Sequence, residues 1–169
     1  MFVKTDPEKI KDNVFKLISK DWLLVTAGEI NNYNMMTASW GALGHLWNKN
    51  ICIAFVRPQR YTYDFMEKYD YFTFSFYSEK YRDMLKFCGT KSGRAFNKTE
   101  ECGLTPIESF NKSIYFNEAD LVFECKKLYY DDLKENNFLI DSLQKEIYPK
   151  KDFHRLYIGE ITNTLLRDK

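Results

Sequence analysis

The chain has 169 residues, 44% of them hydrophobic, so it is long enough to bury a real core and does not have the composition of a disordered protein. Twenty-five basic and 24 acidic side chains leave a net charge of +1, which argues against a protein that coats nucleic acid or an anionic membrane. No run approaches the roughly 18 apolar residues of a membrane span, and no secretory signal opens the sequence. We therefore expect a cytoplasmic protein with no nucleic-acid and no membrane partner, folded as a single domain over residues 1–169.

The first part of the sequence predicts an N-terminal helix over residues 1–20. Asp6 is a suitable N-cap, and Pro7 suits the first helical position. Between Ile10 and Ile18, apolar side chains recur at the spacing of one helix face.

Residues 21–166 predict a barrel with helical insertions. Short helices are expected at residues 41–47, at 62–69 with Thr62 as cap, at 78–89 between Ser78 and Gly89, and at 138–147. The strand patterns fall at residues 22–27, 33–40, 51–56, 71–77, 107–110, 114–116, 119–130 and 153–166. Strands and helices do not alternate as βαβ units, so the pattern predicts a mainly β fold, an antiparallel barrel with short helices.

The familiar catalytic signatures are absent from this sequence. There is no G-x-G-x-x-G, no Walker loop, no G-x-S-x-G and no H-E-x-x-H. The only histidines, His45 and His154, cannot build a histidine-rich metal site, so we expect no metal. Any reaction that side chains alone cannot carry out would then require a bound cofactor.

Residues 34–41 form the first segment that suits a ligand. The strand runs through Thr37 and Ser39 into a glycine turn, with Met36 and Trp40 as apolar walls. Hydroxyls and main-chain amides at a strand end can bond the polar edge of a planar ring. Taken alone, the segment is equally typical of an ordinary barrel strand.

Two further segments suit a phosphate. In residues 57–63, Arg57 and Arg60 flank the start of a helix whose first amides are free, and Thr62 adds a hydroxyl. In residues 88–94, a small-residue loop carries Lys91 and Arg94. Either could instead be a solvated basic loop. Together with residues 34–41, they would suit a nucleotide-like ligand with one planar head and one phosphate tail.

The order of these motifs resembles the flavin reductase-like, FMN-binding split-barrel family, and in particular its flavoredoxin-like branch. The matching segments span most of the chain, from Trp22 to Ile161, and residues 95–98 depart from the acidic stretch that commonly follows the loop in that family. The matching segments are residues 25–28, 34–41, 57–62, 88–94 and 154–161.

The resemblance implies a six-stranded Greek-key barrel that forms a homodimer and holds FMN near the subunit interface. It implies that residues 37–39 contact the isoalloxazine and ribityl groups, that Arg60 and Thr62 hold the phosphate, and that His154 positions the substrate. The full set of cofactor-binding residues expected from the motifs is Met36, Thr37, Ala38, Ser39, Trp40, Arg57, Arg60, Tyr61, Thr62, Lys91, Ser92 and Arg94.

Two functions remain open from the sequence. One is an NAD(P)H-dependent flavin reductase that transfers hydride from NADH or NADPH to FMN. The other is an FMN-containing electron carrier that is reduced by a protein donor. The sequence carries no nicotinamide fingerprint that would choose between them.

The four cysteines have no C-x-x-C spacing and are expected to be reduced thiols. Cys52 and Cys125 fall in strand patterns and should behave as small hydrophobic residues. Cys88 and Cys102 could approach each other, and whether they have a redox role stays open.

Overall fold

The structure, a computed structural model, describes residues 1–168 and is built around one antiparallel sheet of eight strands. The strands pair in the order β3-β2-β6-β9-β10-β5-β4, and β1 pairs with β10. The mainly β antiparallel fold predicted from the sequence is confirmed, with β1 and β4 in addition to six strands. The sheet contains β1 (Phe2–Thr5), β2 (Leu23–Glu29), β3 (Asn32–Ala38), β4 (Gly41–Leu46), β5 (Lys49–Val56), β6 (Tyr71–Phe76), β9 (Leu121–Asp132) and β10 (Arg155–Arg167).

Both faces of the central strands are buried. In β9, Phe123 and Cys125 belong to one core cluster, whereas Val122 between them belongs to a second cluster on the other face. Successive side chains of a strand point to opposite faces, so both sets of side chains in such a strand are buried. Residues 121–125 are accordingly all buried, and the charged residue among them, Glu124, accepts hydrogen bonds from Ser113 and Asn163, both at 2.6 Å.

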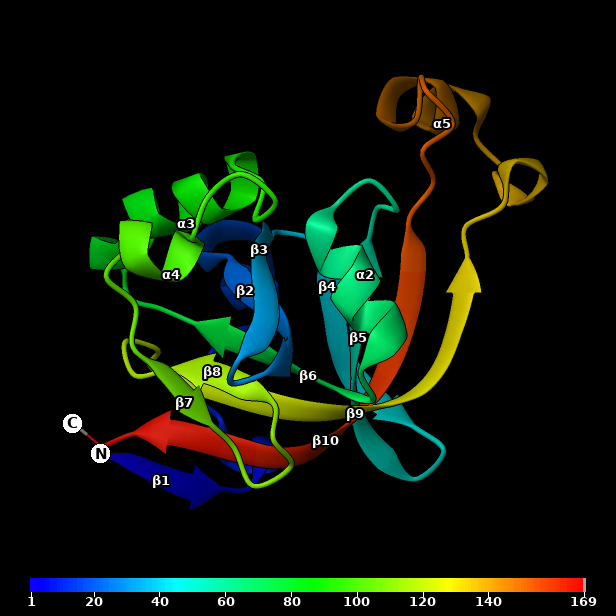
Figure 1. Ribbon diagram of the computed structural model, residues 1–169. Coiled ribbons are helices and arrows are strands. Elements are labelled where there is room, and N and C mark those ends of the chain that lie inside the picture. The colour runs from blue at the N-terminus through cyan, green and yellow to red at the C-terminus, as the bar shows by residue number, and fades with distance from the viewer. Residues whose placement is uncertain (169) are drawn as a thin grey trace.

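The second face of the sheet is covered by helix α3 and the small hairpin of β7 and β8, which lie on the left in Figure 1. Leu85 of α3 and Phe116 of β8 pack together in the second cluster. Helix α2 contacts β2 and β3 but packs in the first cluster, through Phe65 and Met66. These elements are α2 (Tyr61–Lys68), the short turn η3 (Glu79–Tyr81), α3 (Arg82–Thr90), α4 (Lys98–Glu101), β7 (Pro106–Glu108) and β8 (Ile114–Phe116).

Gly159, in the middle of β10, is required by the packing of the core. A Cβ atom at this position would lie 2.7 Å from the Phe72 ring and 3.0 Å from Cβ of Cys125. In the same part of the core, the sulfur atoms of Cys52 and Cys125 lie 3.0 Å apart. Both behave as buried small hydrophobic residues, as their strand positions predicted.

The prediction of one helix over residues 1–20 is wrong. Residues Phe2–Thr5 form β1, which pairs with the C-terminal strand so that the two chain ends lie side by side (Figure 1). Asp6 does act as an N-cap, but only for the short turn η1 (Pro7–Lys9). Asn13 then caps a separate helix, because its side chain accepts from the Lys16 amide at 3.0 Å. Two caps within eight positions divide the segment into η1, α1 (Val14–Lys16) and η2 (Leu17–Asp21).

Three other local predictions need correction. Residues 41–46 form strand β4, paired with β5, because Trp47 and Asn48 adopt positive φ angles of 52° and 57° and close a hairpin between the two strands. Arg60, not Thr62, is the N-cap of α2, so Thr62 lies inside the first turn. Helix α3 continues through Gly89 to Thr90.

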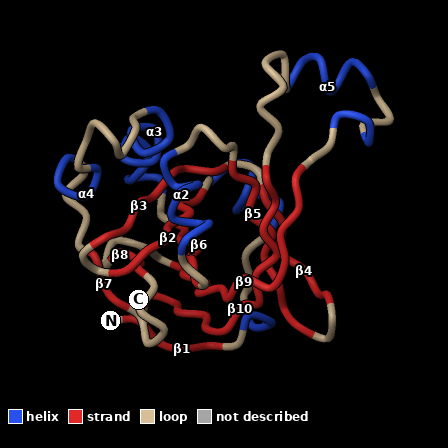
Figure 2. The backbone as a smooth tube through the Cα atoms, turned by 45° about the vertical axis from the view of Figure 1, so that its right-hand side comes forward, coloured by secondary structure: helices blue, strands red, loops and turns tan. Residues whose placement is uncertain are grey.

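Between β9 and β10 the chain forms an arm, residues 133–154, that projects beyond the sheet at the upper right of Figure 1 and is also visible in Figure 2. It contains η4 (Glu135–Asn137) and α5 (Asp141–Ile147). The rings of Phe138, Tyr148 and Phe153 pack together inside it. Within residues 1–168, no helix is both long and apolar enough to cross a membrane.

Candidate functional site

Where β3 ends, the structure contains a cavity of about 250 Å³, here called the ring pocket. Its floor is the end of β3 and the turn that follows, and its sides come from β5, α3 and the base of the arm. It gathers the five residues of segment 34–41 that were expected to bind the cofactor, residues 36–40. The lining residues are Met36, Thr37, Ala38, Ser39, Trp40, Phe55, Arg57, Arg60, Gly89 and His154.

One hydroxyl of the ring pocket is already engaged. Thr37 donates its hydroxyl to the Leu85 carbonyl of α3 at 2.5 Å. A Cβ atom on Gly89 would come within 3.2 Å of Thr37, so the glycine permits this close approach of α3 to β3. Thr37 therefore anchors the helix and retains only acceptor capacity and its backbone for a ligand.

His154 lies at the base of the arm and forms one side of the ring pocket. Its ring is 7% exposed and packs near the rings of Trp40, at 5.4 Å, and Phe55, at 6.4 Å. Burial, and then the nearby Arg57 charge, lower the pKa of His154 to about 4. Its Nδ1 lies 2.7 Å from the hydroxyl of Tyr148, whose pKa burial raises. His154 is thus a neutral imidazole at neutral pH, held in place by a phenol.

Arg57 lines the ring pocket, but its charge is already paired. The guanidinium donates to Asp152 at 2.5 Å and to the Ile147 carbonyl at 3.1 Å. It also lies 5.1 Å from the centre of the Tyr148 ring. Since Gln59 donates to the same carboxylate at 2.6 Å, Arg57 mainly fixes the arm to the end of β5.

A second cavity of about 170 Å³, here called the cationic pocket, lies beside the start of α2. It brings together Arg60 and Thr62 from one predicted segment and Lys91 and Ser92 from the other. Its full lining is Asn34, Met36, Gln59, Arg60, Tyr61, Thr62, Thr90, Lys91, Ser92, Gly93 and Lys98. No carboxylate lines it, although three cations do.

Within residues 1–168, neither Arg60 nor Lys91 forms an ion pair with a carboxylate. Burial, followed by repulsion from Arg57, lowers the pKa of Arg60. The first amides of α2 also lack helical acceptors. The pocket therefore presents uncompensated positive charge and free donors, as an anion site requires.

Arg94, also predicted at this site, is directed elsewhere. Its guanidinium pairs with Asp64 at 2.7 Å and stacks over the Tyr61 ring at 4.5 Å. The structure therefore places Tyr61 in the wall of the cationic pocket and Arg94 behind that wall.

Asn34 links the two predicted phosphate segments through Thr62 and Gly93. Its amide nitrogen donates to the Thr62 hydroxyl at 2.7 Å, which leaves the hydroxyl proton of Thr62 free to donate to a ligand. A Cβ atom on Gly93 would lie 2.0 Å from the Asn34 side-chain oxygen, so only glycine allows the loop to pass this close.

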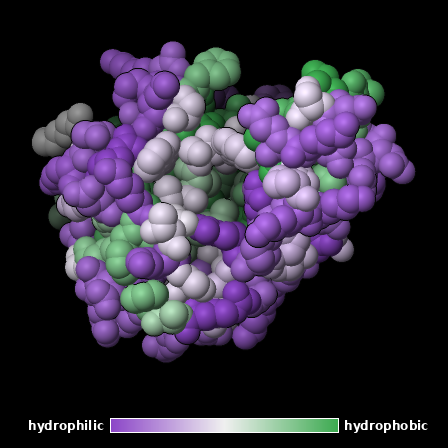
Figure 3. All heavy atoms as spheres, turned by 90° about the horizontal axis from the view of Figure 1, so that it is seen from above, coloured by the Kyte–Doolittle hydropathy of each residue, from purple (hydrophilic) through white to green (hydrophobic). Residues whose placement is uncertain are grey.

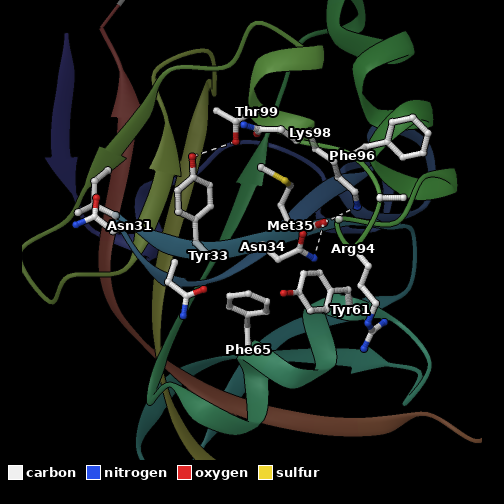
Figure 4. Close-up of a pocket in the computed structure, with 15 residues that line it drawn as sticks. Asn31, Tyr33, Asn34, Met35, Tyr61, Phe65, Arg94, Phe96, Lys98 and Thr99 are labelled. Carbon is white, nitrogen blue, oxygen red and sulfur yellow. Dashed lines mark hydrogen bonds between the residues drawn. The ribbon is translucent and has the colours of Figure 1, made fainter.

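The cavities adjoin one another. The ring pocket and the cationic pocket share Met36 and Arg60. Figure 3 shows the molecule from above, hollowed in its middle between more hydrophilic rims. On the far side of Gly93 lies a groove of about 480 Å³, here called the polar groove. In Figure 4, Tyr61 and Phe65 of α2 face Lys98 and Thr99 across strand β3 in this groove.

Several residues of these cavities were not predicted from the sequence. Asn34 and Gly89 lie within the predicted segments 34–41 and 88–94 but received no role of their own, and Phe55 was assigned only to a strand. Lys98 was noted only as a departure from a family pattern. A lysine or asparagine buried without a carboxylate partner is visible only in three dimensions, so no sequence signal identified these positions.

Cys88 and Cys102 do approach each other, with 3.9 Å between their sulfur atoms. Burial raises the pKa of the Cys88 thiol to about 12 and also raises that of Cys102. Both are thus protonated and unreactive thiols at neutral pH.

The model of the flavin reductase like domain matches residues 15–169. The chain belongs to this family. A comparison with curated proteins gave no match.

Solved structures similar to this flavin reductase-like chain share its fold at low identity. An FMN-binding domain of a flavin reductases-like enzyme from Shewanella baltica has a TM-score of 0.70 and 16% identity, over 98% of this chain and 77% of that one. Flavoredoxin from Methanosarcina acetivorans has a TM-score of 0.69 and 19% identity, over 97% of this chain and 77% of that one. Flavoredoxin of Desulfovibrio vulgaris has a TM-score of 0.69 and 19% identity, over 98% of this chain and 78% of that one.

Proposed function

We propose that this chain is an NAD(P)H-dependent flavin reductase that binds FMN across the ring pocket and the cationic pocket. The observation that carries the proposal is that these two cavities adjoin through Met36 and Arg60. The ring pocket is lined by aromatic rings, a methionine and the backbone at the end of β3. The cationic pocket is lined by cations and hydroxyls, and no carboxylate lines it. A ligand with a planar ring at one end and a phosphate at the other matches both.

The cationic pocket favours FMN over FAD. A phosphate monoester is close to doubly charged at neutral pH and is stable in a buried site only with paired donors. Arg60, Lys91, Thr62 and Ser92 supply charge and hydroxyl donors around one volume of about 170 Å³. The sequence has no dinucleotide glycine fingerprint for a pyrophosphate.

In the ring pocket, the protein would bind and orient the two reacting rings. The bound flavin supplies the redox chemistry, since it accepts a hydride from a reduced nicotinamide. Met36 and Trp40 would wall the flavin, and backbone groups of residues 37–39 would bond its polar edge. Neutral His154, held by Tyr148, would donate to a substrate carbonyl and exclude water without adding charge.

The test is stopped-flow mixing of the FMN-loaded protein with NADH and, separately, NADPH. We expect the flavin absorbance to bleach with at least one of them at a rate that saturates with coenzyme concentration. Absence of bleaching with both would favour the second candidate, an FMN-containing electron carrier reduced by a protein donor. The structural likeness to two flavoredoxins supports keeping that alternative.

We also propose that the protein is a homodimer with aromatic and apolar side chains at the interface. Trp40, at the rim of the ring pocket, is 47% exposed, and Trp47, edge-on to Tyr129, is 54% exposed. Leu139 and Ile140 of the arm are also exposed. A monomer would leave all these side chains in water. Light scattering at micromolar concentration should give twice the chain mass; a flavin-loaded monomer would contradict the proposal.

A further inference from the structure

Tyr148 connects the arm to the ring pocket without lining the pocket itself. It directly follows α5, is only 6% exposed, and packs against the rings of Phe138 and Phe153. Its hydroxyl lies 2.7 Å from Nδ1 of His154, whose ring does line the pocket. The phenol is therefore the contact through which the arm determines what His154 presents to a ligand.

A neutral imidazole carries its proton on either Nδ1 or Nε2, and the hydrogen-bond partner of one nitrogen decides which. Within residues 1–168, Nδ1 of His154 is the one hydrogen-bond partner of the Tyr148 hydroxyl. If Nδ1 carried the proton, it would donate to the phenol oxygen, and the buried O–H would have no acceptor. If Nδ1 is bare, the phenol donates to it and both groups are satisfied. The geometry therefore favours a proton on Nε2.

The second ring nitrogen of His154 is left for a ligand. Among the described residues, no group forms a hydrogen bond with Nε2, although the side chain is buried. Nε2 is also not sealed inside the core, in contrast to the unpartnered hydroxyls of Thr26 and Tyr77. Since the imidazole forms one side of the ring pocket, an N–H on Nε2 is available to a ligand in that cavity.

The neighbouring charges do not disturb this arrangement. The guanidinium of Arg57 lies 5.1 Å from the centre of the Tyr148 ring, but it donates to Asp152 and to the Ile147 carbonyl. It therefore does not compete for the phenol oxygen or for the imidazole. Burial raises the pKa of Tyr148, and burial with the Arg57 charge lowers the pKa of His154 to about 4. At neutral pH the phenol keeps its proton and the imidazole holds only one.

We propose that Tyr148 is a positioning residue that holds the proton of His154 on Nε2, so that the ring pocket presents a hydrogen-bond donor to its ligand. The part of this inference that concerns the reaction rests on the proposed function. A donor at this point selects ligands that offer an oxygen or ring nitrogen with a free lone pair, such as a carboxamide or a ring carbonyl. It also excludes His154 as a general base, because the lone pair of Nδ1 already accepts from the phenol.

The tautomer can be measured by nitrogen NMR of the full chain with isotopically labelled histidine, with and without FMN. The chain has two histidines, so a His45→Gln variant assigns the spectrum. Nε2 couples to both ring C–H protons, whereas Nδ1 couples strongly to only one, which identifies the nitrogen that carries the proton. We expect the proton of His154 on Nε2 in both samples. A wild-type spectrum with the proton on Nδ1 would overturn the inference, whether or not the protein reduces flavin.

Two variants complete the test. Tyr148→Phe removes only the hydroxyl, because phenylalanine keeps the ring in its aromatic cluster. Without a donor to Nδ1, the proton of His154 should exchange between both nitrogens, and their resonances should move towards each other. The rate of flavin bleaching at saturating coenzyme should fall at least about threefold, while FMN affinity changes less than about twofold. Tyr81→Phe, at a tyrosine of η3 that packs against Tyr77, is the matched control and should change neither.

The possible failures are distinguishable. If neither NADH nor NADPH bleaches the bound flavin, the proposed function itself is wrong, and the nitrogen spectra still decide the state of His154. If bleaching occurs but Tyr148→Phe leaves either the tautomer or the bleaching rate unchanged, only the inference about Tyr148 is overturned. A fall in FMN affinity as large as the fall in rate would also overturn it, because the phenol would then support the fold of the site alone. The wild-type spectra decide the tautomer even if the variant does not fold.

Discussion

The ring pocket and the cationic pocket share a wall but differ in how far the charges that line them are paired. In the ring pocket, Arg57 is paired with Asp152 and His154 is neutral, so the unpaired charge at this cavity is that of Arg60, on the wall shared with the cationic pocket. In the cationic pocket, Arg60 and Lys91 have no carboxylate partner among the described residues, and Lys98 adds a third cation. The unpaired cations thus gather around the cationic pocket, and only Arg60, which both cavities share, also borders the ring pocket.

This difference assigns separate roles to residues that the sequence had grouped together. Arg57 and Arg60 stand three positions apart, yet one fixes the arm and the other faces an open anion site. Binding energy in the cationic pocket should depend on the phosphate, and binding in the ring pocket should not. FMN and riboflavin, which differ only by that phosphate, separate the two contributions.

The largest effect is expected for Arg60→Ala. Removing one partner of a buried charged pair should weaken FMN binding by about 2–4 kcal/mol, whereas riboflavin should lose almost nothing. Flavin fluorescence titrations of wild type and variant with both ligands measure this. If both ligands lose affinity equally, Arg60 supports the ring or the fold, and the contrast between the pockets is wrong.

The next effect is expected for Gly93→Ala. The new Cβ would lie 2.0 Å from the Asn34 side-chain oxygen, so the loop carrying Lys91 and Ser92 must shift away from Asn34. Overpacking costs a folded protein about 1–3 kcal/mol, and we expect the displaced loop to weaken FMN binding by no more than that amount. Gly44→Ala is the matched control, since nothing lies within 4 Å of the added atom. Equal behaviour of the two variants in the same titration would show that the loop position does not matter.

A smaller effect is expected for Arg57→Ala, on the ring-pocket side of the comparison. Because this guanidinium is paired with Asp152 and is partly exposed, its loss should change FMN affinity by less than about 1 kcal/mol. The arm should instead become more susceptible to limited proteolysis within residues 133–154. An FMN loss as large as that of Arg60→Ala would mean that both arginines hold the phosphate.

The smallest effect is a pH dependence of stability from His154. Its pKa is depressed to about 4 in the folded state, below the unfolded value near 6.5, so the unfolded chain binds the extra proton. Stability should therefore fall as pH decreases from 6.5 towards 4. In denaturant titrations over this range, His154→Gln should lose less stability than wild type. If the free energy of unfolding of both proteins falls equally with pH, a group other than His154 causes the acid sensitivity.

Parts of this fold were predictable because the local pattern and the tertiary environment agree. The alternation of aromatic and hydroxyl residues predicted β6, and the apolar run of residues 51–56 predicted β5. The N-terminal helix was wrong because Asn13 caps a second helix and β10 offers an edge to residues 2–5. The helix at residues 41–47 was wrong because pairing with β5 overrides local preference.

The site was partly predictable for a similar reason. Arg60, Thr62, Lys91 and Ser92 come from motifs with free donors, and the structure brings them to one cavity. Arg57 and Arg94 look the same in sequence, but a carboxylate from a distant segment pairs with each.

The most direct test of the account is a crystal structure of the protein with bound FMN. We expect the phosphate oxygens within hydrogen-bond distance of the side chains of Arg60 and Lys91, and the isoalloxazine against residues 36–40 beside His154. A flavin with its phosphate in the polar groove, or with its ring outside the ring pocket, would contradict the central claim.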